Sequence, residues 1–110
     1  MKLSNAARAI VDVRKLRDYC LSREHPRGQH KARVFQSALG WTAASAEEVR
    51  RRLLEVVQRE EATFLGSDDY GKRYALDFSV HGPAGPVTVR SLWIVRRDED
   101  FPRFASCYIL

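Results

Sequence analysis

The residues best suited to chemistry gather in one basic turn of the sequence. His25, His30 and Lys31 lie close together there, and Pro26 and Gly28 between them favour a turn. An apolar pattern typical of a helix begins directly afterwards, so these side chains stand at a helix N-terminus. Free amide groups, a flexible glycine and several cations at a helix start favour the binding of phosphate. The alternative is that the cations extend into water or pair with a neighbouring glutamate.

A second set of polar side chains belongs to the C-terminal half of the chain. Tyr70, Arg73 and Arg90 lie in or beside stretches that alternate between apolar and polar residues, as half-buried strands do. Helices that precede an antiparallel sheet can bring this polar face and the basic turn onto one cleft. Such a set of groups suits metal-independent cleavage of RNA.

In that reaction a general base takes the proton of a ribose 2′-hydroxyl, which attacks the adjacent phosphorus, and a general acid protonates the departing 5′ oxygen. His30 is the candidate base or acid, because imidazole exchanges protons near neutral pH. Lys31, Arg73 and Arg90 are candidates to hold the phosphate. Tyr70 is a candidate to stack on a base.

These residues also have purely structural interpretations. Asp77 and Arg90 can form an ordinary ion pair across two strands. Tyr70 can simply pack at the rim, and Trp93 shares a face with valines and is expected in the core. The sequence contains no nucleotide-binding loop, metalloprotease motif or nucleophile elbow. We therefore expect no cofactor, and the few Cys and His residues make a metal site unexpected.

Helical periodicity dominates the N-terminal half. Residues 1–9 are expected to form a loose arm, after which Asp12 caps a first helix. The basic turn opens a second helix, which ends at Gly40. Ser45 and Glu48 have the spacing of a capping box at the start of a third helix. The buried stripe of that third helix is predicted to be Val49, Leu53, Val56 and Val57.

The second half of the chain changes to the period of β-strands. Strands are expected at about 62–65, 73–80, 87–95 and 104–110. A turn at 82–85 places Asp77 opposite Arg90 and Arg73 opposite Ile94. The fold class is therefore α+β, with two to three N-terminal helices packed on a three- to four-stranded antiparallel sheet, and residues 1–110 form a single domain.

The composition indicates which kind of partner and which cellular compartment to expect. The chain has 110 residues and a formal net charge of +5, which favours a polyanionic partner such as nucleic acid. Cys20 and Cys107 are its two cysteines, and both are expected to be reduced core residues of a cytoplasmic protein. We find no stretch apolar enough for a signal peptide or a membrane span.

A set of residues spread from about Asp12 to the end of the chain forms a specific pattern: Lys15, Leu16, Tyr19, His25, Pro26, Gly28, Lys31, Ala32, Phe35, Leu39, Gly40, Tyr70, Gly71, Arg73, Tyr74, Asp77, Gly82, Pro83, Gly85, Val89, Arg90, Trp93, Ile94 and Tyr108. In this pattern, nearly the whole chain resembles a bacterial domain family of unknown function. Members of this family are small stand-alone proteins and the C-terminal tips of polymorphic, contact-dependent toxins. The order of helices and sheet is also similar to that of the barnase, EndoU, colicin and RelE ribonuclease toxins.

The resemblance implies a ribonuclease toxin that a small cognate antitoxin or immunity protein inhibits. Lys31, Arg73 and Arg90 are then the phosphate-binding residues. The position of His30 varies in the family, so the resemblance leaves His25 or Tyr70 to supply acid–base chemistry. The alternative is a non-catalytic module, either a basic binding domain or a partner subunit of a two-gene complex.

Overall fold

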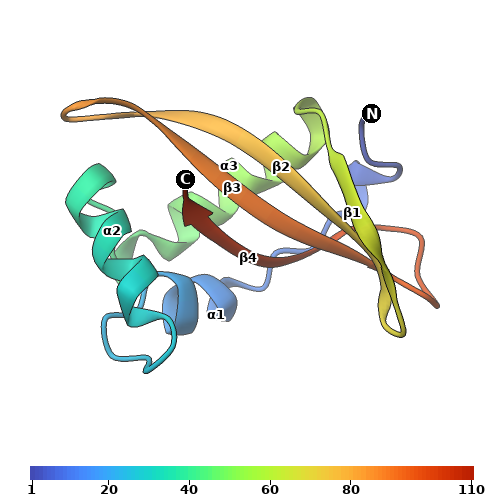
Figure 1. Cartoon of the computed structure of the whole chain (residues 1–110), viewed down its shortest axis with the longest axis horizontal. Coiled ribbons are helices and arrows are strands. Elements are labelled where there is room, and N and C mark those ends of the chain that lie inside the picture. Colours follow the sequence, from blue (N-terminus) through green and yellow to red (C-terminus); the bar gives the residue numbers. More distant parts are fainter.

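Helices cover one face of a four-stranded antiparallel sheet in the computed structural model, which describes residues 1–110 (Figure 1). The helical segments are η1 (Ala6–Arg8), α1 (Val13–Lys15), η2 (Leu16–Cys20), α2 (Gln29–Leu39), η3 (Ala43–Ser45) and α3 (Ala46–Arg59). The strands are β1 (Thr63–Asp68), β2 (Gly71–Gly82), β3 (Gly85–Arg96) and β4 (Arg103–Ile109), in the spatial order β1-β2-β3-β4. The predicted α+β class is confirmed.

Local signals set the ends of the helices. The side chain of Asp12 accepts a hydrogen bond of 3.0 Å from the backbone N–H of Arg14, which confirms it as the cap of α1. Gly40 ends α2 with a φ of 70°, a conformation that glycine adopts without strain. The capping box predicted at the start of α3 is wrong. The Ser45 hydroxyl instead accepts a bond of 3.1 Å from the Thr42 N–H, within a box that caps η3.

The long β2–β3 hairpin has the predicted register. Asp77 lies opposite Arg90, and Arg73 lies opposite Ile94. Gly82 and Gly85 close the hairpin, and the carbonyl of Ala38 lies so close to Gly82 that a Cβ there would collide with it. The C-terminal end of α2 is therefore fixed beside the β2–β3 turn.

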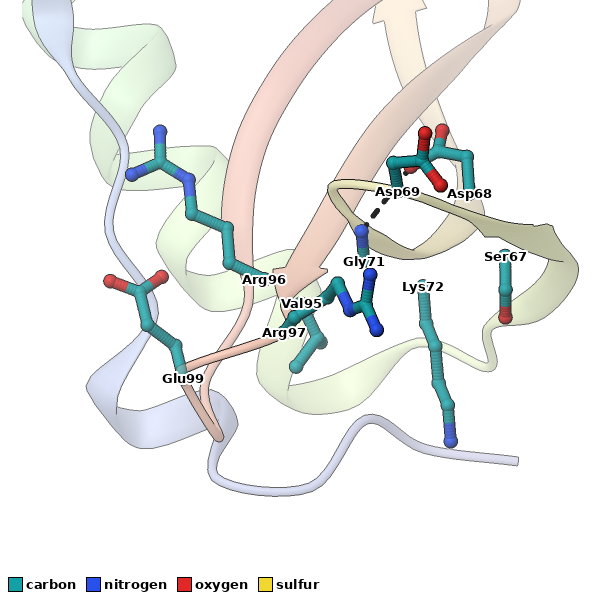
Figure 2. A pocket seen from close by; sticks show the side chains of 9 residues that line it. All are labelled: Ser67, Asp68, Asp69, Gly71, Lys72, Val95, Arg96, Arg97 and Glu99. Atoms are coloured by element: carbon teal, nitrogen blue, oxygen red, sulfur yellow. Dashed lines mark hydrogen bonds between the residues drawn. The ribbon is translucent and has the colours of Figure 1, made fainter.

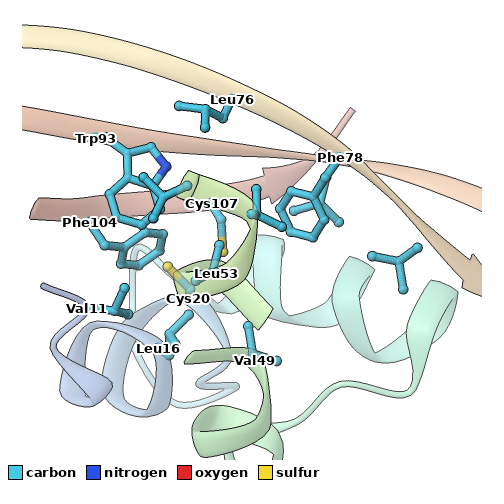
Figure 3. Packing of buried hydrophobic residues seen from close by; sticks show 14 of the residues in the cluster. Val11, Leu16, Cys20, Val49, Leu53, Leu76, Phe78, Trp93, Phe104 and Cys107 are labelled. Atoms are coloured by element: carbon cyan, nitrogen blue, oxygen red, sulfur yellow. The ribbon is translucent and has the colours of Figure 1, made fainter. Parts of the chain in front are cut away.

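The core lies between the helices and the sheet (Figure 3). It contains Trp93 and the predicted stripe of α3, which consists of Val49, Leu53, Val56 and Val57. Cys20 and Cys107 are free and buried in it, as predicted. Hydrogen bonding between the two thiols lowers the pKa of Cys20 and, together with burial, raises that of Cys107, since the two side chains meet where η2 packs under β4.

The N-terminal residues are not the loose arm that was predicted. Leu3 is buried in the core. The Asn5 amide donates to the carbonyl of Asp100, and Arg8 forms an ion pair with the Asp100 carboxylate at 2.7 Å. These contacts fix the segment against the loop before β4, because an apolar anchor and two polar ones act together. No helix is both long enough and apolar enough to span a bilayer.

One buried hydroxyl joins two strands and the largest core side chain, which allows a test of the packing. The Ser91 hydroxyl donates to the carbonyl of Leu76 at 2.8 Å and accepts from the indole N–H of Trp93 at 2.9 Å. We expect Ser91→Ala to lower the free energy of unfolding by about 1–3 kcal/mol in urea denaturation, because it leaves the indole N–H unpaired in the core. Ser79→Ala, at an exposed position of the same sheet, should change it by less than about 0.5 kcal/mol. Equal losses in the two variants would contradict this interpretation.

Candidate functional site

A half-buried ammonium group lies where α2 meets the edge of the sheet. The Nζ atom of Lys31 is 5.3 Å from the centre of the Tyr108 ring and 5.7 Å from the centre of the Tyr19 ring. Tyr19 comes from η2 and Tyr108 comes from β4, so three separate elements supply the group. The faces of aromatic rings attract cations, and this attraction orients the Lys31 side chain.

Tyr108 connects this group to the open face of the sheet, which is the face that the helices do not cover. Arg90 lies directly opposite Tyr108 in the β3–β4 register. Its guanidinium binds the carboxylate of Asp77 through two hydrogen bonds of 2.8 Å each. Hydrogen bonding to Arg90 lowers the pKa of Asp77, while Asp77 first and the Tyr108 hydroxyl second raise the pKa of Arg90. The site therefore forms a continuous series from Lys31 through Tyr108 to Arg90 and Asp77.

His25 shapes the loop that leads into α2. Its Nδ1 accepts hydrogen bonds from the backbone N–H groups of Arg27 at 3.0 Å and of Gly28 at 3.1 Å, so its neutral ring carries the proton on Nε2. Its ring lies edge-on to the Tyr19 ring, with centres 4.7 Å apart. A Cβ at Gly28 would collide with the Tyr19 carbonyl. The predicted turn is thus packed closely against Tyr19.

The first turn of α2 presents free backbone donors. His30 is exposed there, and the backbone N–H groups of His30 and Lys31 make no backbone hydrogen bond. No side chain caps this end of the helix, which begins after Gly28. Anions are favoured at such a terminus because the helix dipole adds to the nearby positive charge.

The structure separates the other predicted residues from this group. The Arg73 guanidinium binds Asp68 at 2.6 Å, and Tyr70 stands in the β1–β2 turn with 72% of its surface exposed. Arg73 faces Ile94, which is about 13 Å along β3 from Arg90 at the usual rise of a strand. The β1–β2 turn lies at the opposite end of β2 from the hairpin turn that α2 contacts.

The single cleft expected from the sequence is therefore not formed. Lys31 contacts Tyr19 and Tyr108 at the α2 end, where His25 also packs on Tyr19 and Arg90 lies opposite Tyr108. His30 is exposed in the first turn of α2, whereas Arg73 and Tyr70 belong to the other end of β2. A hollow of ≈ 700 Å³ lies beside the β1–β2 turn (Figure 2). Its lining consists of Ser67, Asp68, Asp69, Gly71, Lys72, Val95, Arg96, Arg97 and Glu99. The physical reason for the separation is the length of β2, which covers Gly71–Gly82.

Tyr19 and Tyr108 are the candidate site residues that the sequence-based assignment missed. Tyr19 has the helical spacing of a core-facing residue and Tyr108 lies in the last predicted strand, and each side chain is half-buried. In the structure Tyr108 lies directly opposite Arg90, but the sequence does not predict this pair, because a bulge between Leu92 and Trp93 shifts the β3–β4 register. Nowhere in the chain do three or more His, Cys, Asp or Glu side chains form a group that could hold a metal ion.

Comparison with known proteins identifies the family. A family model described as a domain of unknown function, DUF6883, matches residues 2–110, and the chain belongs to that family. Comparison with curated proteins gives no match. Among solved structures, a chain of the contact-dependent growth inhibition toxin–immunity protein complex from Klebsiella pneumoniae 342 is similar, with a TM-score of 0.61 and 14% identity. The similarity covers 94% of this chain and 95% of that one, so the two share a fold.

The ion pair between Asp77 and Arg90 predicts a dependence of stability on pH. The pKa of Asp77 is lowered in the folded state, so the pair stabilises the fold above the ordinary Asp pKa and is lost as the pH falls through the folded pKa. We expect the free energy of unfolding to fall less between about pH 5 and pH 2 in Asp77→Asn than in the wild type. Asp98→Asn, an exposed control without an ion pair, should keep the wild-type slope. Identical slopes for all three proteins would contradict the role of the pair.

Proposed function

We propose that this protein is a toxin-type, metal-independent endoribonuclease of a toxin–antitoxin or toxin–immunity pair. The observation that carries the proposal is the series of Lys31, Tyr108 and Arg90, in which an ammonium, a phenol and a guanidinium are aligned beside a free helix N-terminus. Two further observations support it. The net charge is +5, and the fold is similar to that of a chain in a growth-inhibition toxin–immunity complex.

The phosphate of the RNA would bind between Lys31 and Arg90. The ammonium of Lys31 and the free N–H groups of the first turn of α2 supply donors on one side. Arg90 uses Nε and Nη2 to hold Asp77, which leaves Nη1 to donate to a phosphate oxygen. These groups would stabilise the additional negative charge of the transition state.

Cleavage requires two proton transfers. The 2′-hydroxyl loses its proton to a base, the O2′–P bond forms, the P–O5′ bond breaks, and the 5′ oxygen takes a proton from an acid. His30 is exposed with neither ring nitrogen bonded within the protein, so it is our candidate for one transfer. The Tyr108 hydroxyl, on the residue opposite Arg90 in the β3–β4 register, is our candidate for the other.

The remaining predicted residues take lesser parts in this proposal. His25 positions the loop before α2, and only its Nε2–H is left to donate to a substrate. Arg73 and Tyr70 would meet the RNA only at a distance from the cleaved bond, where Tyr70 could stack on a base. The cognate antitoxin or immunity protein would bind the toxin and block the RNA.

One observation favours a non-catalytic module instead. Arg73, Arg90 and Arg103 on the sheet are each neutralised by a carboxylate, at distances of 2.6–2.8 Å. Paired arginines of this kind add little to the attraction of a polyanion. A sheet face with paired arginines is sufficient for a basic binding domain or for a partner subunit of a two-gene complex.

Cleavage of purified RNA in the presence of EDTA separates the two functions. We expect fragments with 2′,3′-cyclic phosphate and 5′-hydroxyl ends, and a loss of rate of about 10²-fold or more in Lys31→Ala and in Arg90→Ala. Tyr108→Phe, which keeps the ring under Lys31 but removes the proton, should lose a similar factor. Arg52→Ala removes one exposed charge from α3 and is the matched control. Intact RNA, or fragments that all four variants still produce at the wild-type rate, would contradict the proposal.

A further inference from the structure

The two edge strands of the sheet differ in how far other segments cover their backbone. At the β4 edge, the backbone of Ile10 bonds to Pro102 at 3.0 Å and to Phe104 at 2.9 Å, and Lys15 donates to the carbonyl of Phe104 at 3.2 Å. The outer edge of β1 has no such cover between Thr63 and Asp68 (Figure 1). Natural proteins normally protect an edge strand, because its free N–H and C=O groups pair readily with another strand.

The uncovered strand is also the most apolar exposed part of the sheet. Phe64 is 51% exposed and Leu65 is 56% exposed, at neighbouring positions of β1. Phe64 lies against the Tyr74 ring, with centres 5.5 Å apart, so its ring is held in place although it faces water. Exposed apolar side chains beside free backbone groups are typical of a surface that accepts an added strand.

A hollow of ≈ 330 Å³ adjoins β1 on the sheet, and its lining specifies what such a strand would carry. The lining consists of Glu60, Glu61, Thr63, Leu65, Ala75, Asp77 and Arg90. Leu65 and Ala75 offer apolar surface, and the carboxylates of Glu60 and Glu61 line the same hollow as the Asp77–Arg90 ion pair. This combination suits a Lys or Arg side chain, whose methylene stem contacts the apolar residues while its charged end meets the carboxylates.

We propose that the β1 edge binds an extended strand of a partner protein and that a basic side chain of this strand enters the hollow. A second copy of this chain is a poor occupant. Glu60 and Glu61 precede β1, and Asp68 and Asp69 end it, so antiparallel pairing of two β1 strands would place carboxylates against carboxylates. A strand with basic residues meets complementary charge instead.

The position of the hollow links this docking surface to the candidate site. Asp77 and Arg90 line the hollow, and Arg90 is also the last cation of the series that begins at Lys31. A partner cation beside Asp77 would compete with Arg90 for that carboxylate and would cover the arginine. This consequence rests on the proposed nuclease function, whereas the binding of a basic strand does not.

Titration of the whole chain with two blocked peptides tests the inference by NMR. Both alternate Thr and Val, and they differ only in a central Lys or a central Glu. We expect the Lys peptide to shift the amide signals of Thr63–Asp68 and of Glu60, and to bind about tenfold more tightly than the Glu peptide. Equal binding of the two peptides, or shifts confined to β4, would overturn the inference.

Three variants separate the edge from general charge effects. Leu65→Lys places a cation in the hollow and on the edge, and Glu60→Gln removes one carboxylate. Each variant should therefore bind the Lys peptide several-fold more weakly than the wild type. Glu55→Gln removes an exposed carboxylate of α3 that does not line the hollow, and it should bind like the wild type. A dimer in sedimentation that Leu65→Lys dissociates would show that a second copy occupies the edge, and would overturn the choice of partner. These experiments contain no RNA, so a negative result in peptide binding would not contradict the nuclease proposal.

Discussion

The placement of the Lys31 ammonium between the rings of Tyr19 and Tyr108 is the contact on which the candidate site depends. It fixes the start of α2 against both η2 and the last strand. Two glycines make this approach possible: Gly28 allows the loop to touch Tyr19, and Gly82 allows the hairpin to touch the end of α2. The cation, the phenol and the free helix N-terminus are therefore held together by the contacts of Lys31 with the two rings and by the close backbone approaches at the two glycines.

The sheet divides the molecule's surface into regions with different chemistry. One end carries the aligned cations of the proposed RNA site, and the other end carries the hollow beside the β1–β2 turn. Between them, ion pairs neutralise the arginines of the open face. The uncovered edge at β1 lies next to Arg90 through a shared hollow. A partner that adds a strand there would reach the proposed RNA site without covering the whole face.

Local sequence patterns predicted most of the fold, because strands, helices and turns depend mainly on residues close together in the sequence. The alternation in β2 and β3 and the glycines of their turn determine the register that pairs Asp77 with Arg90. The helical stripe of α3 and the end of α2 at Gly40 follow from spacing and from glycine's conformational freedom. The sequence did not predict that the N-terminal segment is fixed to the rest of the fold, because Leu3 is buried by contacts with residues far away in the sequence.

The candidate site was predicted only in part, for a related reason. Lys31 and Arg90 could be selected by charge, yet nothing local shows that Tyr108 lies between them. That contact depends on a bulge between β3 and β4 and on the docking of α2 beside the sheet edge. Arg73 has the same residue type and faces the same side of the sheet as Arg90, but the length of β2 carries it away.

Titration with a short 2′-O-methyl RNA, followed by NMR, measures the central claim most directly, because this ligand binds as RNA does but has no 2′-hydroxyl to attack. The proposed site predicts that the largest signal changes occur at Lys31, Tyr108 and Arg90, and that they disappear in Lys31→Ala. Signal changes confined to the hollow around Lys72, Arg96 and Arg97, with Lys31 unaffected, would contradict it.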